Sequence, residues 1–257
     1  MRLKWSGTMA QRQLGKLNCH VVDGLSSGAQ PSIAVVLCHG YGAPADDLAP
    51  IGAELLQTDP AIRSGVRFYF PAAVLDLGPA GLPGGRAWWP LDMERLVMAA
   101  QTGRWDEMRR RAPPGFDLAR ERMMGLIADI RRETGLPLGR IVLGGFSQGA
   151  MLSADVALRL EEPVAAVCLA SGVLLAEPEW KVLAAKQAPL DVLMSHGTQD
   201  PILPFFGAEA LRDLLIAHGH KVEFLPFSGG HTIPWPILGA LAKRLVRLAQ
   251  NAAGDEC

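Results

Sequence analysis

Residues 140–150, RIVLGGFSQGA, decide the fold of this chain. The apolar run IVLG is typical of a buried strand, and the residues after Ser147 have a helical pattern. A serine between two glycines at such a turn is typical of a nucleophile elbow, where any Cβ at the glycine positions would clash. The free N–H groups of the helix start face developing negative charge. The segment predicts Ser147 as a nucleophile; the alternative is a helix-capping serine in an ordinary glycine-rich turn.

Strands and helices alternate on both sides of this segment. Strands are predicted at residues 33–40, 66–71, 140–147, 164–172, 190–197 and 221–229. Helices are predicted at residues 46–57, 116–133, 148–160, 206–218 and 234–249. Several of the strands are apolar almost throughout, as in a parallel sheet that is covered on both faces. We therefore expect one α/β domain over residues 1–257, with a mostly parallel, doubly wound sheet and helices on both faces.

Composition and charge exclude several classes of protein. The chain has 257 residues, 49% of them hydrophobic and 20% charged, which is incompatible with intrinsic disorder and sufficient for a core without metal or disulfide. The formal net charge of -1 gives no electrostatic case for binding nucleic acid or an anionic membrane. The start of the chain lacks the apolar segment of a secretory signal, and no apolar stretch reaches the about 18 residues of a membrane span. We expect a cytoplasmic protein.

The four cysteines, at positions 19, 38, 168 and 257, have no zinc or redox spacing. Cys38 and Cys168 lie in apolar runs that are predicted strands. A free thiol behaves as a small hydrophobic group, so both are expected in the core.

A serine hydroxyl needs a base and a third group that orients the base. In this type of sheet the acid and then the histidine follow the serine along the chain, each after a later strand. Asp200, in SHGTQDPILP, and His231, in FSGGHTIP, satisfy that order. Asp191 and Asp213 do not, because the first begins a strand and the second lies inside a helix. The other histidines are expected to make capping or loop hydrogen bonds, with the last two exposed: His20, His39, His196, His218 and His220.

The loop after the first predicted parallel strand, CHGYG at residues 38–42, supplies a second element of an acyl-transfer site. Two backbone N–H donors must meet the oxyanion, each worth about 3–4 kcal/mol in the barrier. Gln148 would supply one and Tyr41 the other. The same loop contains G-x-G-x-x-A, a loose dinucleotide fingerprint, but Pro44 lies inside it and no acidic residue follows at the expected place.

In this order and spacing, HGYG, GFSQG, HGTQDPILP and SGGHTIP resemble the phospholipase/carboxylesterase family of α/β hydrolases, which includes the acyl-protein thioesterases. The resemblance covers about residues 33–249. It implies Ser147 as nucleophile, Asp200 as acid and His231 as base. It also implies the Tyr41 and Gln148 backbones as oxyanion hole, small-molecule carboxylic ester or thioester substrates, no cofactor, and frequent homodimers.

Residues 76–115 depart from the family pattern because this segment is longer than expected. Its Gly/Pro-rich opening, residues 78–85, and two helical patterns at 91–100 and 104–111 predict a hinged cover over the carboxyl ends of the strands. An acyl pocket is predicted from its apolar residues, although packing onto the sheet is the alternative: Trp88, Trp89, Leu91 and Met93. The three arginines at 109–111 favour a solvated helix end over an anion site.

Together these residues predict a serine carboxylesterase that hydrolyses short- to medium-chain esters through a Ser-His-Asp triad and an acyl-enzyme. Two alternatives stay open. One is an acyl-protein thioesterase or lysophospholipase for longer acyl chains. The other is a ligand-binding receptor, because a fold does not determine a function.

Overall fold

The computed structural model describes residues 8–92, 96, 98, 104–105 and 109–254, and in this part of the chain eight strands form one sheet. Its strands in spatial order are β1 (Thr8–Leu14), β2 (Leu17–Asp23), β4 (Val66–Pro71), β3 (Ile33–Cys38), β7 (Ile141–Phe146), β8 (Ala166–Ala170), β9 (Asp191–Gly197) and β10 (Lys221–Phe227). From β4 to β10 all neighbours are parallel, whereas β1 and β2 add an antiparallel edge. The predicted mostly parallel α/β sheet is confirmed.

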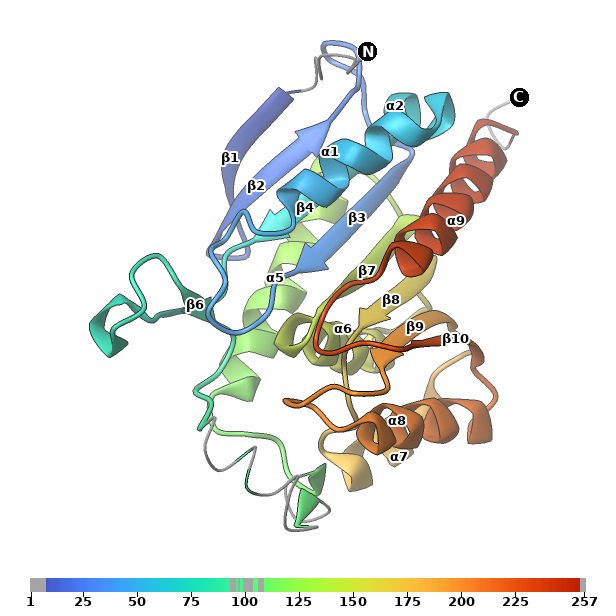
Figure 1. The fold of residues 1–257 in the computed structure, drawn as a ribbon. Coiled ribbons are helices and arrows are strands. Elements are labelled where there is room, and N and C mark those ends of the chain that lie inside the picture. The colour runs from blue at the N-terminus through green and yellow to red at the C-terminus, as the bar shows by residue number, and fades with distance from the viewer. Residues whose placement is uncertain (1–7, 93–95, 97, 99–103, 106–108, 255–257) are drawn as a thin grey trace.

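Helices cover both faces of this sheet and enclose two hydrophobic cores. One face carries α1 (Ala49–Thr58), α2 (Pro60–Gly65) and α9 (Trp235–Gly254), which lie in front of the strands in Figure 1. The other face carries α5 (Phe116–Thr134), α6 (Gln148–Arg159), α7 (Glu177–Lys186) and α8 (Phe205–Ala217). Burial on both faces explains why the β3 sequence, IAVVLC, is apolar throughout.

Several elements differ from the predictions, and helix α2 is among those that were not predicted. The first helix begins at Ala49 rather than at residue 46, because Pro50 suits a first turn and the Asp46 carbonyl accepts the Ala49 N–H in the preceding turn. The hairpin of β1 and β2 was not predicted. Helix α7 was not predicted either, although Trp180 within it is fully buried.

The described residues of the segment at 76–115 lie beyond the carboxyl ends of the parallel strands (Figure 1, teal to green). It opens with a small hairpin of β5 (Leu75–Asp76) and β6 (Arg86–Ala87) around the 3-10 turn η1 (Gly78–Ala80). Arg86 fastens this hairpin: its carbonyl accepts the Gly42 N–H at 2.9 Å, and its own N–H donates to the Ala43 carbonyl at 3.1 Å. The Gly/Pro-rich opening is thus a hairpin bonded to the loop that contains Tyr41, and the hinged cover stays a prediction. Most of the predicted helix at 91–100 and residues 106–108 of the predicted helix at 104–111 lie outside the described residues.

Candidate active site

Ser147 lies at the turn between β7 and α6 with φ 54° and ψ -117°, a conformation that L-residues rarely adopt. The chain around it is crowded. A Cβ at Gly145 or at Gly149 would overlap the carbonyl oxygen of Cys38 at the end of β3. The Ser147 N–H donates to the Ala170 carbonyl of the neighbouring strand at 3.0 Å. The glycines and this bond hold the serine at the carboxyl edge of the sheet, where the sequence predicts it.

Asp200 follows β9 and His231 follows β10, and the two side chains are hydrogen-bonded to each other. The His231 Nδ1–H donates to Asp200 Oδ2 at 2.6 Å, and Asp200 Oδ1 accepts the backbone N–H groups of Ile202 and Leu203 at 2.9 Å each. Burial alone would raise the pKa of Asp200, but hydrogen bonds from His196, His231 and Leu203 hold that pKa well below its ordinary range. An ionised carboxylate therefore faces the imidazole N–H.

The loop that carries His231 is fastened beside the elbow. The ring of Phe146, the residue before Ser147, packs against the His231 imidazole with centroids 4.7 Å apart. The Ser171 hydroxyl donates to the Thr232 carbonyl at 3.0 Å. The structure thus gathers the acid–histidine pair and the serine turn at one edge of the sheet.

His196 is a site residue that the sequence analysis missed. It is fully buried, and its Nε2 lies 2.8 Å from the Leu203 carbonyl and 3.2 Å from Asp200 Oδ2. A carbonyl oxygen can only accept, so Nε2 carries a hydrogen that Asp200 also attracts. The available signal was its position: it closes an apolar strand four residues before Asp200.

The prediction for His220 is wrong. It is buried rather than exposed, because its Nδ1 accepts the Leu190 N–H at 3.1 Å beneath the chain that enters β9.

The loop that contains Tyr41 is held by His39, whose buried side chain spans two backbone groups. Nδ1 donates to the Gly40 carbonyl at 2.8 Å, and Nε2 accepts the Ala73 N–H at 3.2 Å. Burial lowers the pKa of His39, which favours this neutral form. Among the residues that the structure describes, the backbone N–H groups of Tyr41 and Gln148 have no acceptor. Both are thus available for a developing oxyanion.

The Gln148 side chain connects the site to the segment at residues 76–115, called the inserted segment below. Its Oε1 accepts the Trp88 N–H and its Nε2 donates to the Trp89 carbonyl, both at 3.0 Å. The Trp88 indole N–H donates to the His39 carbonyl at 2.9 Å. The prediction that Trp88 lines the acyl pocket is therefore corrected: it is fully buried behind the loop of Tyr41 and supports that loop.

A cavity of about 640 Å³ opens beside Ser147. Trp89 and Leu91 line this cavity, and Trp89 is held edge-on to the Phe116 ring with centroids 4.8 Å apart. Met93 lies outside the described residues. The walls are mostly apolar side chains from the inserted segment, from α6 and from the loops after β8 and β9: Trp89, Leu91, Leu96, Trp105, Met151, Val173, Leu175, Ile202 and Leu203.

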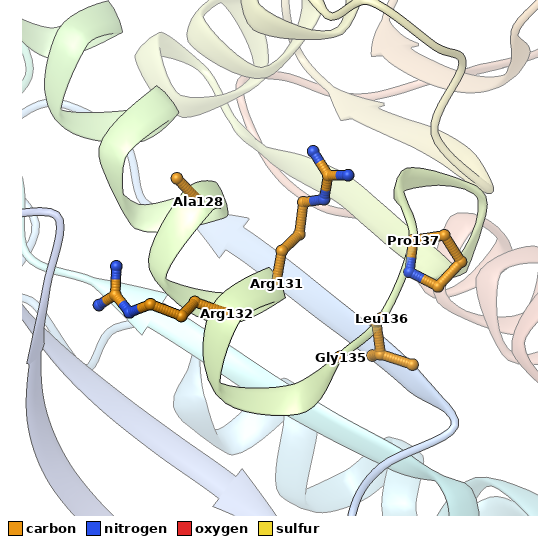
Figure 2. A pocket seen from close by; sticks show the side chains of 6 residues that line it. All are labelled: Ala128, Arg131, Arg132, Gly135, Leu136 and Pro137. Atoms are coloured by element: carbon orange, nitrogen blue, oxygen red, sulfur yellow. The ribbon is translucent and has the colours of Figure 1, made fainter.

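Figure 2 shows another depression, at the end of α5, whose lining contains none of the predicted catalytic residues. Its two arginines leave the helix in different directions, and each is already paired: Arg131 with Glu161 at 3.0 Å and Arg132 with Asp129 at 2.8 Å. Across the described ranges, no three His, Cys, Asp or Glu side chains are grouped as a metal site. No helix there is long and apolar enough to cross a membrane.

Comparison with known proteins gives consistent matches. Residues 20–247 match the sequence profile of the phospholipase/carboxylesterase family. The chain is 31% identical over 195 residues to acyl-protein thioesterase 1 of Eremothecium gossypii, which covers 73% of this chain and 74% of that protein. The crystal structure of esterase PE8 has a TM-score of 0.72 at 30% identity, covering 96% of this chain and all of that one. A carboxylesterase from Mesorhizobium loti (TM-score 0.68, 17% identity, 93% and 98% coverage) shares the fold.

Proposed function

The chain belongs to the phospholipase/carboxylesterase family of α/β hydrolases and is a carboxylic ester hydrolase; from this premise we propose that it cleaves short- to medium-chain esters through Ser147, His231 and Asp200. The observation that carries the proposal is the 2.6 Å bond from His231 Nδ1–H to a buried Asp200 carboxylate. That bond fixes the tautomer whose Nε2 lone pair can accept a proton from a serine.

The proposed reaction has two halves. His231 Nε2 takes the Ser147 proton as the hydroxyl oxygen attacks the ester carbonyl, and the N–H groups of Tyr41 and Gln148 stabilise the oxyanion. Collapse of this intermediate expels the alcohol, which receives the proton from His231. Water then attacks the acyl-enzyme with His231 again as base, and the acid is released. Asp200 stays ionised throughout and stabilises the imidazolium.

The shape of the cavity supports the acyl-length range. Burial of each methylene against the apolar walls contributes about 0.8 kcal/mol. The enzyme therefore binds the transition state of a longer acyl chain more tightly, as long as the walls still contact the added methylenes. A volume of about 640 Å³ is finite, and the gain stops when the chain outgrows it. The relatives named acyl-protein thioesterase favour the second candidate, a thioesterase for longer chains.

A chain-length series of p-nitrophenyl esters tests the proposal, with matched thioesters assayed in parallel. We expect kcat/KM to climb from acetyl to about butyryl or hexanoyl and then to fall. Palmitoyl substrates as the best ones would favour the thioesterase candidate. A single-turnover burst without steady hydrolysis would favour a receptor on the hydrolase fold.

A further inference from the structure

Three charged side chains line the cavity beside Ser147: Asp92, Arg109 and Arg111. Two of them have partners. Arg109 Nε lies 3.0 Å from the Glu177 carboxylate, and Asp92 has an interaction of its own. The Gln148 amide is also occupied, because both of its ends bond to the backbone of the inserted segment. These polar groups are therefore committed within the protein.

Arg111 differs from them. It lines the cavity from an exposed position, and in the described part of the chain no carboxylate lies within ion-pair distance of it. Glu177, the partner of Arg109, is not paired with Arg111. Lys181 Nζ lies 2.9 Å from that carboxylate, and the Lys181 hydrogen bond and the attraction of Arg109 and Arg110 lower the pKa of Glu177 against the effect of burial. Among the described residues, the Arg111 guanidinium thus has no carboxylate partner, and it lines the same apolar cavity as Ser147.

We propose that the cavity selects esters that carry a second, anionic group, and that Arg111 binds this group; the inference rests on the function proposed above. The planar guanidinium presents paired N–H donors that match a carboxylate or a phosphate. It also raises the local concentration of anionic substrates. An uncharged ester offers this side chain only neutral acceptors, which bind a guanidinium more weakly than an anion does. The substrate class is therefore an ester with an apolar section between its reacting carbonyl and a terminal anion.

Arg110 provides a matched control. It is exposed and adjacent in sequence, yet it does not line the cavity. Arg111→Gln and Arg110→Gln therefore remove the same charge from the same surface, and only the first removes it from the cavity. A difference between the two variants cannot come from net charge.

Two isosteric substrate pairs read out the anion. The first pair, the p-nitrophenyl monoesters of glutarate and of glutaramate, carries the charge on the acyl side. The second pair, the butyryl esters of 4-hydroxybenzoate and of 4-hydroxybenzamide, carries it on the alcohol side. We expect the parent enzyme to prefer the charged member of one pair by about fivefold in kcat/KM at low salt, as for a solvent-exposed ion pair. The pair that shows the preference identifies the half of the substrate that meets Arg111.

Arg111→Gln should abolish the higher kcat/KM for the charged ester, and Arg110→Gln should keep it. In the parent, high salt should reduce the ratio of kcat/KM between the charged and the neutral ester. The inference is overturned if the parent hydrolyses charged and neutral members of both pairs equally, or if the two variants lose the preference to the same extent. Failure to hydrolyse any of the four esters would instead overturn the proposed function.

Discussion

Ser147 combines an unusual backbone conformation with a position at the head of α6, which makes it the sharpest single-residue test. Ser147→Ala keeps the Cβ and removes only the hydroxyl, so we expect an intact fold. Ester hydrolysis should fall by several orders of magnitude, because triad members act as a unit. A fluorophosphonate probe should label Ser147 in the parent and nothing in the variant. Labelling elsewhere, or activity within about tenfold of the parent, would contradict the assignment.

His196 is tested through Asp200. Burial raises the pKa of Asp200, but donors that include His196 hold it below its ordinary range. A carboxyl with a lowered pKa stabilises the fold above its ordinary pKa, and that stability is lost as the pH falls through the folded-state value. His196→Phe removes one donor and so raises the folded-state pKa of Asp200. The variant should therefore be less stable than the parent near neutral pH, and its free energy of unfolding should fall by less on acidification and level off at a higher pH. Urea titrations at a series of neutral to acidic pH values measure the change.

His196→Gln is the control for this prediction. Its amide keeps an N–H donor near the same place, so it should restore much of the neutral-pH stability that His196→Phe loses, together with the larger fall on acidification. If both variants behave alike, the imidazole contributes packing and not a hydrogen bond to Asp200.

Among the elements, the inserted segment separates two tryptophans with different roles. Trp89 lines the cavity, whereas Trp88 bonds to the His39 carbonyl. Trp89→Ala should flatten the climb of kcat/KM with acyl length and leave acetyl esters nearly unaffected, because short chains do not reach the wall. Trp88→Phe should lower kcat/KM for all the esters by a similar factor, because losing the indole N–H loosens the loop of Tyr41. A uniform loss in Trp89→Ala, measured with the ester series, would assign that residue to the fold alone.

The elements also show what the sequence could predict. Strands β3 and β7 are apolar runs followed by chemistry-bearing turns, so both their type and their position were accessible. The β1–β2 hairpin was not, because its strands mix polar and apolar residues and a two-residue turn joins them. That turn, Gly15 and Lys16, has positive φ at both residues, and Gly15 packs against the backbone of α5. Such a contact between distant segments leaves no local pattern.

The same limit applies to the site. The order of Ser147, Asp200 and His231 is visible in the chain because each follows a strand. The contact of His196 with Asp200 depends on how two turns fold back on each other, and the place of Trp88 behind the loop of Tyr41 depends on long-range hydrogen bonds. The spacing of apolar and polar residues along the chain predicts neither of these two contacts.

At the scale of the whole molecule, Asp155 joins three helices in the core on one face of the sheet. This fully buried carboxylate in α6 accepts hydrogen bonds from Arg120 of α5 at 2.6 Å, Arg159 at 2.9 Å and the Trp180 indole of α7 at 2.8 Å. Asp155→Ala leaves two guanidinium groups without their buried partner, and we expect a loss of about 3–5 kcal/mol in the free energy of unfolding. Urea denaturation measures it.

Glu161→Gln is the matched variant, because it removes the exposed partner of Arg131. An exposed pair of this kind is worth at most about 1 kcal/mol. Equal losses in the two variants would mean that Asp155 has no special role in holding the helices together.

The strand order has a consequence for how this enzyme loses activity during warm storage. Ser147 follows β7 in the middle of the sheet, whereas His231 follows β10, which within the described chain pairs only with β9. An outer strand held from one side opens more readily than an interior one. Warm storage should therefore uncouple the base from an elbow that is still well formed. The first molecules to lose activity would still be folded, and cooling would restore their activity, before any of them aggregate.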